Sequence, residues 1–356
     1  MAEYQIAVIA GDGIGPEVTR EAMKVLDAAA QIWGFRTRRT SYPFGTDHYL
    51  ATKEIFPDAA FEEVKHKQAI FLGAIGDPRV PVGLIEYGVI AKMRFELDLY
   101  VNLRPIKLFD ESLCPLKDKG PQDVDMVIVR ENTEDAYVGA HGFTHKGQST
   151  EVATQTMVYT RAGVERVMRY SFELARTRPR RQLTLIDKAN AVRAQDLWTR
   201  TFADVSKEYP DIKTDHAYID AACMWMVKNP EWFDVAVTTN LFGDIITDLG
   251  AMIQGGMGIA ASGNLHPGQV SLFEPIHGSA PKHAGKNVSS PVAAIMAVSM
   301  MLDYLGEKAA SVAIETAVAE LLRSKRLKGV QTGVHPTNEV GDMVVRELGA
   351  RAAVRV

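Results

Sequence analysis

The sequence predicts an α/β fold with a largely parallel sheet. Short apolar runs alternate with longer amphipathic segments, which is the pattern of strands connected through helices. Polar or glycine-containing turns bound each run. The first helix is expected from about 17 to 33, after a glycine-rich turn. The expected strands span 5–10, 69–72, 126–129, 183–186 and 235–238.

Size and composition limit the class of protein. The 356 residues exceed a typical single domain, so we expect two. The net charge of −4 does not indicate binding to nucleic acid or to an anionic membrane. Cys114 and Cys223 are too few for a disulfide framework and favour a reducing compartment. Without a signal-like start or an apolar run of roughly 20 residues, the sequence indicates a cytoplasmic enzyme.

The turn after the first expected strand does not match a Rossmann fingerprint. Its pattern, Gly11-x-Gly13-x-x-Pro16, lacks the third glycine that allows close helix–strand packing. No acidic residue ends a second strand about 20 residues later, where a ribose would be bound. The sequence therefore predicts that the fold is not a Rossmann fold, and it disfavours a malate dehydrogenase of that type.

Three aspartates are candidate metal ligands. Asp244 and Asp248 are four residues apart on one expected helix face, and we expect the apolar residues between them to face the core. The helix follows an expected strand, at the sheet edge where α/β proteins bind ligands. Paired carboxylates suit Mg²⁺ or Mn²⁺, although a solvated helix face has the same pattern. Asp220, in an apolar setting, is the third candidate.

Three arginines, a lysine and a tyrosine are candidates for carboxylate binding and proton transfer. Arg94, Arg104 and Arg130 offer bidentate sites for carboxylates, although each alone is more typical of a surface ion pair. Lys188, after the expected strand 183–186, and Tyr137 are candidate proton carriers. An ordinary exposed lysine is the simpler interpretation of Lys188 taken alone.

Two further segments stand out. The segment 273–281 is rich in small residues that let backbone amides approach phosphates or a ribose, although a buried structural loop would also explain it. The polar segment 139–160 alternates like a β-hairpin. That hairpin is either a surface feature or an arm between subunits.

Six motifs together resemble the β-decarboxylating dehydrogenases, the family of the 3-isopropylmalate, isocitrate, homoisocitrate, D-malate and tartrate dehydrogenases. The similarity runs over nearly the whole chain and is closest to the D-malate–tartrate and isopropylmalate branches. The motifs are GDGIGPEV, RFELDLYVNLRP, VRENTEDAYVG, DKANAV, TNLFGDIITDLG and FEPIHGSAP.

The resemblance implies a two-domain isopropylmalate/isocitrate dehydrogenase-like fold. Residues 1–99 and 255–356 would form the cofactor-binding domain. Residues 100–254 would form the substrate, metal and dimerisation domain, with an arm near 139–160. A homodimer with shared active sites is expected, without nucleic-acid or membrane partners.

The resemblance also assigns the reaction, which is metal-dependent, NAD(P)-linked oxidative decarboxylation of a (2R)-malate-type hydroxy acid. Arg94, Arg104 and Arg130 would bind the substrate carboxylates. Tyr137 would protonate the enolate after CO₂ leaves.

The metal and the base are shared between subunits in this family. Asp244 and Asp248 would bind Mg²⁺ or Mn²⁺ together with Asp220 of the partner subunit. Lys188 of the partner subunit would take the proton of the 2-hydroxyl group.

The cofactor is NAD or NADP, because two positions depart from the NAD-dependent pattern. Lys282 stands where NAD-dependent members have an aspartate, and a cation suits the 2′-phosphate of NADP. Ser290 replaces an asparagine that contacts adenine. The expected cofactor-binding residues are Glu274, His277, Gly278, Ser279, Ala280, Lys282 and Ser290.

The residues before Arg94 indicate the substrate. Isocitrate enzymes have a serine and an asparagine where this chain has Gly88 and Ile90. A γ-carboxylate would stay unpaired there, at a cost of about 2–5 kcal/mol. The sequence therefore favours 3-isopropylmalate or D-malate, with Ile90 contacting the substrate. Tartrate, isocitrate and homoisocitrate are the alternatives, followed by a non-catalytic regulatory subunit, which the intact site residues disfavour.

Overall fold

The computed structural model, which describes residues 1–353, divides the chain into two compact units. The first unit contains Met1–Leu99, Lys107–Pro121 and the residues from Ala251 onward. The second contains Tyr100–Ile106 and Gln122–Gly250. The segment Lys107–Pro121 thus belongs with the first unit, whereas the sequence placed it within 100–254. The functional roles assigned to the two domains remain predictions.

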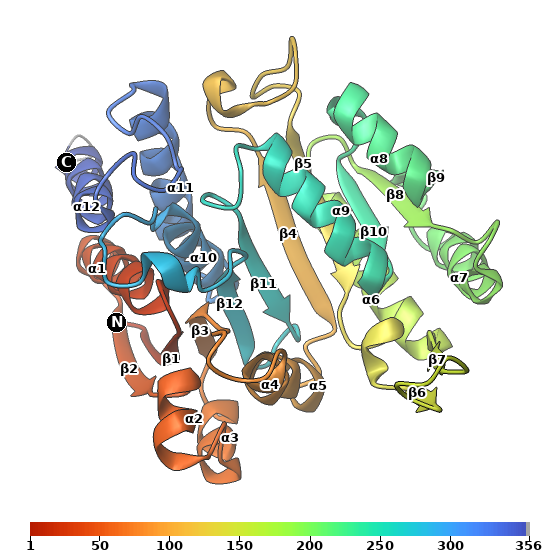
Figure 1. The fold of residues 1–356 in the computed structure, drawn as a ribbon. Helices are drawn as coiled ribbons and strands as arrows, with labels where there is room; N and C mark the ends of the chain where they lie inside the picture. Colours follow the sequence, from red (N-terminus) through yellow and green to blue (C-terminus); the bar gives the residue numbers. More distant parts are fainter. Residues whose placement is uncertain (354–356) are drawn as a thin grey trace. The chain divides into compact units, whose positions relative to one another are not determined.

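Each unit is built around five strands, and the predicted α/β fold with a largely parallel sheet is confirmed (Figure 1). In the first unit β3 pairs in parallel with β1 and β12, and β1 pairs in parallel with β2. Strand β11 pairs antiparallel with its neighbour β12. The order is β2 (Arg36–Tyr42), β1 (Glu3–Gly11), β3 (Ala69–Ala74), β12 (Ser271–Pro275) and β11 (Ala261–Leu265).

The helices of the first unit cover these strands. Helix α1 buries Val18, Ala22, Val25 and Ala29, whose spacing of three or four residues forms one apolar stripe. It ends at Gly34, which adopts a left-handed conformation with φ 75°. The helices are α1 (Gly15–Trp33), α2 (Thr46–Thr52), α3 (Asp58–Lys65), α4 (Leu84–Glu86), α5 (Lys92–Glu96), α10 (Val292–Tyr304), α11 (Lys308–Arg323) and α12 (Thr337–Ala353).

In the second unit β10 lies between β5 and β8, and β8 also pairs with β9, all in parallel. Buried Val, Ile and Leu side chains fill β5, β8 and β10, as expected for strands covered on both faces, whereas β9 is mostly exposed. The order is β4 (Val101–Lys107), β5 (Asp125–Glu131), β10 (Val235–Thr238), β8 (Gln182–Asp187) and β9 (Lys213–Tyr218). The helices are α6 (Arg161–Thr177), α7 (Asp196–Ser206), α8 (Ile219–Lys228) and α9 (Asn240–Ile253).

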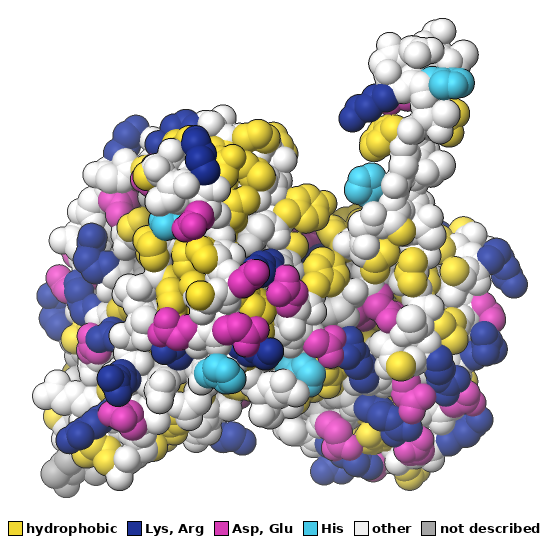
Figure 2. All heavy atoms as spheres, turned by 90° about the horizontal axis from the view of Figure 1, so that it is seen from below, with side chains coloured by type: hydrophobic (Ala, Val, Ile, Leu, Met, Phe, Trp, Pro, Cys, Tyr) yellow, Lys and Arg dark blue, Asp and Glu magenta, His cyan; other side chains and the backbone are white. Residues whose placement is uncertain are grey.

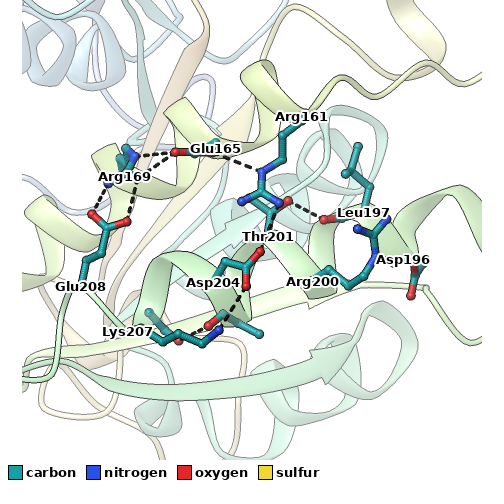
Figure 3. A network of polar contacts seen from close by, with 12 residues as sticks. Arg161, Glu165, Arg169, Asp196, Leu197, Arg200, Thr201, Asp204, Lys207 and Glu208 are labelled. Carbon is teal, nitrogen blue, oxygen red and sulfur yellow. Dashed lines mark hydrogen bonds and ion pairs between the residues drawn. The ribbon is translucent and has the colours of Figure 1, made fainter.

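Aromatic rings and surface ion pairs join α6 to α7 and to the turn that follows α7, and the Phe172 ring of α6 stacks on Phe202 of α7 at 5.5 Å between centroids. The Phe172 ring stacks on that of Tyr209 at 4.6 Å between centroids. Above it, Arg169 binds both Glu165 and Glu208 (Figure 3). Exposed pairs of this kind contribute about 0–1 kcal/mol each, so the buried rings stabilise this contact more than the charges do.

The segment predicted to be a hairpin forms one. Strands β6 (His141–Thr144) and β7 (Val152–Gln155) pair antiparallel, and they form the arm that stands out in Figure 2. Phe143 and Val152 are about half exposed, at 53% and 54%. No helix among residues 1–353 is long and apolar enough to cross a membrane.

Candidate active site

The end of β5 and the start of α9 bring three predicted residues together in the second unit. Arg130 donates from Nε to Asn240 Oδ1 at 2.9 Å and pairs through Nη1 with Asp244 Oδ1. Tyr137 donates to the other Asp244 oxygen at 2.8 Å. The Arg130 guanidinium carbon lies 5.4 Å from the centre of the Tyr137 ring. We call Arg130, Tyr137 and Asp244 the carboxylate cluster.

The electrostatics of α9 differ at its two aspartates. Burial opposes ionisation of Asp244, but the Arg130 charge and the Tyr137 hydrogen bond outweigh it, so the pKa of Asp244 is lowered. Desolvation raises the pKa of Asp248, with Arg104 opposing the rise and Asp244 adding to it. The charges of Arg104 and Arg130 thus favour the ionised form of both carboxylates, although only the pKa of Asp244 is lowered overall. Arg104 itself donates to Asn102 Oδ1 at 2.7 Å.

One detail of α9 was wrongly predicted. Of the apolar residues between the two aspartates, Ile246 is buried, but Ile245 is 57% exposed. Each helical residue is rotated by about 100° from the one before it, so Ile245 and Ile246 face different surroundings. An exposed isoleucine beside a candidate site is a candidate contact surface.

Lys188 and Asp220 form a second group in the same unit. Lys188 Nζ donates to Asp220 Oδ1 at 2.6 Å, and this hydrogen bond lowers the pKa of Asp220. Lys188 follows β8, as predicted, and Asp220 lies in the first turn of α8. The Asp220 side chain is 67% exposed. Within residues 1–353 no group of three or more His, Cys, Asp or Glu side chains is arranged to hold a metal ion, so Asp220 is not grouped with Asp244 and Asp248.

In the first unit, Arg94 lies against a predicted cofactor residue. Arg94 Nη2 is 3.3 Å from Glu274 Oε1, and the same oxygen accepts a hydrogen bond from Asn264 at 2.8 Å. Ile90 belongs to a π-helical turn, Tyr87–Ala91, directly before α5. Such turns often occur at functional sites. Ile90 is partly buried against the apolar core of this unit, so the apolar character predicted for this position is present.

A pocket of about 470 Å³ lies in the first unit and is lined by four of the predicted cofactor-binding residues. That volume is typical of small-molecule sites. His277, Gly278, Ala280 and Ser290 line it, together with Ile14 of the glycine-rich turn. The other wall residues were not predicted, because they carry no distinctive side-chain chemistry. They are Gly255, Gly256, Met257, Gly258, Ser289, Val330, Gln331 and Thr332.

The glycine-rich turn and the segment 273–281 meet directly. Ile14 donates its backbone N–H to the Ser279 carbonyl at 2.8 Å. A Cβ on Gly13, where φ is +58°, would lie 2.0 Å from that same oxygen, so only glycine fits. The turn therefore shapes the pocket wall without having a Rossmann fingerprint.

Lys282 lies beyond the lining of this pocket. It belongs to a 3-10 turn, Pro281–His283, and is exposed. The turn follows Ala280, whose φ of 40° is left-handed. Ser279, also a predicted cofactor residue, is buried and donates to the Gly76 carbonyl. Desolvation lowers the pKa of His277, which favours a neutral imidazole in the pocket wall.

The fold and these groups define an α/β protein with a buried arginine beside a tyrosine and an aspartate in one unit and a pocket of small-molecule size in the other. Residues 5–344 match the family model described as isocitrate/isopropylmalate dehydrogenase. A "3-isopropylmalate dehydrogenase" of Thermobifida fusca is 48% identical over 347 residues, 97% of each chain. One of Frankia casuarinae is 46% identical, covering 98% of this chain and 99% of that one.

Solved structures agree with these relatives. The isocitrate dehydrogenase of Methylococcus capsulatus has a TM-score of 0.87 and 35% identity, covering 97% of this chain and 99% of that one. A β-decarboxylating dehydrogenase of Thermococcus kodakarensis has a TM-score of 0.80 and 32% identity, covering 98% and 97%. The chain belongs to the isocitrate/isopropylmalate dehydrogenase family, as its six motifs predicted.

Proposed function

We propose that this protein catalyses the NAD(P)-linked oxidative decarboxylation of a (2R)-malate-type hydroxy acid, with 3-isopropylmalate as the substrate. The reaction type is inferred from the carboxylate cluster. This cluster combines an arginine that can bind a substrate carboxylate, a tyrosine that can donate a proton and an aspartate that can bind a metal ion. Full-length relatives named 3-isopropylmalate dehydrogenase, at 46–48% identity, support the substrate. The apolar Ile90 fits an alkyl group.

The residues of the chain fit the proposed chemistry. Asp244 and Asp248 present hard oxygen ligands one helical turn apart, which suits Mg²⁺ or Mn²⁺. When bound, the cation would polarise the keto group and the nicotinamide would accept hydride from C2. Arg104 and Arg130 would hold the substrate carboxylates, and Arg94 is assigned the same task.

Proton transfer is assigned to two residues. Tyr137 already donates a hydrogen bond to Asp244, so its hydroxyl proton is directed toward the candidate metal ligands. It would supply the proton that the enolate takes up after CO₂ leaves. Lys188, as the neutral amine, would take the proton from the 2-hydroxyl, and its contact with Asp220 keeps its Nζ close to the third candidate ligand.

A homodimer with shared sites completes the proposal. Lys188 and Asp220 pair with each other rather than with the carboxylate cluster, which fits their assignment to the partner subunit's site. Exposed apolar side chains on α8 and α9 are typical of an interface. They are Met224, Val227 and Ile245, at 67%, 48% and 57% exposure. The β6–β7 arm offers a further contact.

The substrate is tested by steady-state kinetics with 3-isopropylmalate, D-malate, tartrate and isocitrate. We expect the highest kcat/KM for 3-isopropylmalate, because Ile90 provides an apolar contact, and the lowest for isocitrate. D-malate is the second candidate, favoured by the segments VRENTE and LARTRPRRQLT. Exchanging Ile90 for serine should reduce the preference for 3-isopropylmalate over D-malate. Isocitrate as the best substrate of the wild type would refute the assignment of Ile90.

The metal is tested by titrating the protein with Mn²⁺ in a calorimeter. Asp248→Asn should weaken Mn²⁺ binding about tenfold or more, because it removes a charged ligand. Asp196→Asn is the matched control, since Asp196 forms an exposed ion pair with Arg200 within α7 and has no assigned role in the metal site. Removal of divalent cations by a chelator should abolish turnover. Full activity after exhaustive chelation would contradict the metal assignment.

Shared sites predict complementation between two inactive variants. Lys188→Ala and Asp244→Asn should each lose activity, with Lys188→Ala reducing kcat far more than it raises KM. Random mixing of the two subunits should restore about a quarter of the wild-type activity, because half of the dimers are hybrids with one intact site of two. Hybrids confirmed by mass spectrometry but inactive would place each site within one chain.

The cofactor is tested at Lys282. An exposed lysine attracts a 2′-phosphate by about 0.5–1 kcal/mol, which is a few-fold in affinity. We expect both NADP⁺ and NAD⁺ to be used, and Lys282→Asp to shift the ratio of their kcat/KM values a few-fold or more toward NAD⁺. Lys286→Asp makes the same charge change on the same exposed loop and serves as control. Equal shifts in the two variants would show that only the general charge of the loop matters.

A further inference from the structure

A buried set of hydrogen bonds joins the Lys188 loop to the start of α9 within the second unit. The backbone N–H of Lys188 donates to Gln195 Oε1 at 2.6 Å, and Gln195 Nε2 donates to the Tyr159 hydroxyl oxygen at 2.9 Å. The Tyr159 hydroxyl donates to Asp135 Oδ1 at 2.8 Å. Asp135 Oδ2 accepts the backbone N–H of Leu241 at 2.9 Å. We call Gln195, Tyr159 and Asp135 the bridge.

Two of the three bridge residues are shielded from water, and Tyr159 between them is partly buried. Gln195 and Asp135 are fully buried, and buried polar groups hold a fixed geometry when all their partners are present. The Tyr159 ring meets the buried Trp198 ring edge-on, at 6.3 Å between centroids. Burial raises the pKa of Tyr159, so its hydroxyl keeps the proton that it donates to Asp135.

One end of the bridge positions the carboxylate cluster. Asp135 caps α9 through Leu241, and Asp244 follows three residues later. Asp135 also precedes Tyr137 by two residues and has a left-handed φ of 73°, a conformation that its surroundings must hold in place. Fixing Asp135 therefore fixes both ends of the hydrogen bond between Tyr137 and Asp244.

The other end positions Lys188. Gln195 holds the backbone of Lys188 in the turn after β8. The neighbouring Asp187 is fully buried and is held by Thr199 and His216 at 3.1 and 3.0 Å. Because the backbone is fixed on both sides, the Lys188 side chain extends from a rigid base toward Asp220.

We propose that Tyr159 is a positioning residue that sets Lys188 and the carboxylate cluster together, and thereby couples two active sites. This rests on the proposed function, in which Lys188 serves the partner subunit's site while Asp244 serves its own. The Tyr159 hydroxyl is the single atom that links Gln195 to Asp135. Its loss therefore loosens residues that act in two different sites.

The first test is Tyr159→Phe, which removes only the hydroxyl and keeps the ring against Trp198. We expect kcat to fall roughly 10- to 100-fold, as small displacements of catalytic groups do, with KM changed less than about threefold. Tyr209→Phe is the matched control, with the same substitution at a ring stacked on Phe172 in the same unit. It should leave both constants unchanged. A kcat within about twofold of the wild type in Tyr159→Phe would overturn the proposal.

A second measurement separates the bridge from the reaction. Amide hydrogen exchange at Lys188 and Leu241 should accelerate in Tyr159→Phe and not in Tyr209→Phe, whatever the substrate is. Unchanged exchange at either amide would overturn the bridge. Altered exchange in a protein that oxidises none of the hydroxy acids would instead overturn the proposed function alone.

The coupling is tested in the hybrid dimers. The intact site combines the Asp244 of the Lys188→Ala subunit with the Lys188 of the Asp244→Asn subunit. Tyr159→Phe is placed in one subunit or in the other. Loss of activity in both placements supports an action on both sites, and loss in only one placement overturns the coupling.

Discussion

The burial of Arg130 is the constraint on which much of the second unit depends. Its side chain is only 2% exposed, and an unpaired charge at such depth would cost several kcal/mol. Asn240 and Asp244 supply the compensating acceptors. Position 243 must be glycine for the same reason, because a Cβ there would lie 2.4 Å from Arg130 Cγ. The start of α9 is therefore shaped around one guanidinium, which at the same time leaves Asp244 beside Tyr137.

The acidic run that follows Arg130 has a structural task. Glu131 accepts hydrogen bonds from the backbone of Thr133 and Glu134, and burial raises its pKa to about 7. Glu134 binds the backbone N–H of Thr160 at 2.9 Å, and Asp135 caps α9. These carboxylates hold the loop between β5 and the hairpin. The run thus fixes the backbone directly before Tyr137.

The elements that follow local rules could be predicted from the sequence, and those that depend on distant contacts could not. Strands β1, β3, β5, β8 and β10 and helix α9 were predicted, because apolar runs and the four-residue spacing of Asp244 and Asp248 are local signals, whereas strands β2, β4, β9, β11 and β12 were not predicted. The pair of Lys188 with Asp220 joins residues 32 positions apart, and no local pattern specifies it. The membership of 107–121 in the first unit follows from long-range ion pairs such as Asp110 with Lys325. The pocket walls near 255–258 and 330–332 were not predicted, because they come from segments far apart in the sequence that carry no charged side chain.

The π-helical turn at Tyr87–Ala91 has a consequence for how this scaffold diversifies. A π-turn contains one residue more than an α-turn. The segment Tyr87–Ala91 therefore has one residue more than an α-helical turn needs, directly before the helix that contains Arg94. Deleting that residue would restore an α-helical register and turn Ile90 and its neighbours by about 100° around the axis. Arg94 would stay in its helix while a different side chain took the place of Ile90. A single-residue deletion in this turn would therefore redirect several side chains at once, a change that no point substitution produces.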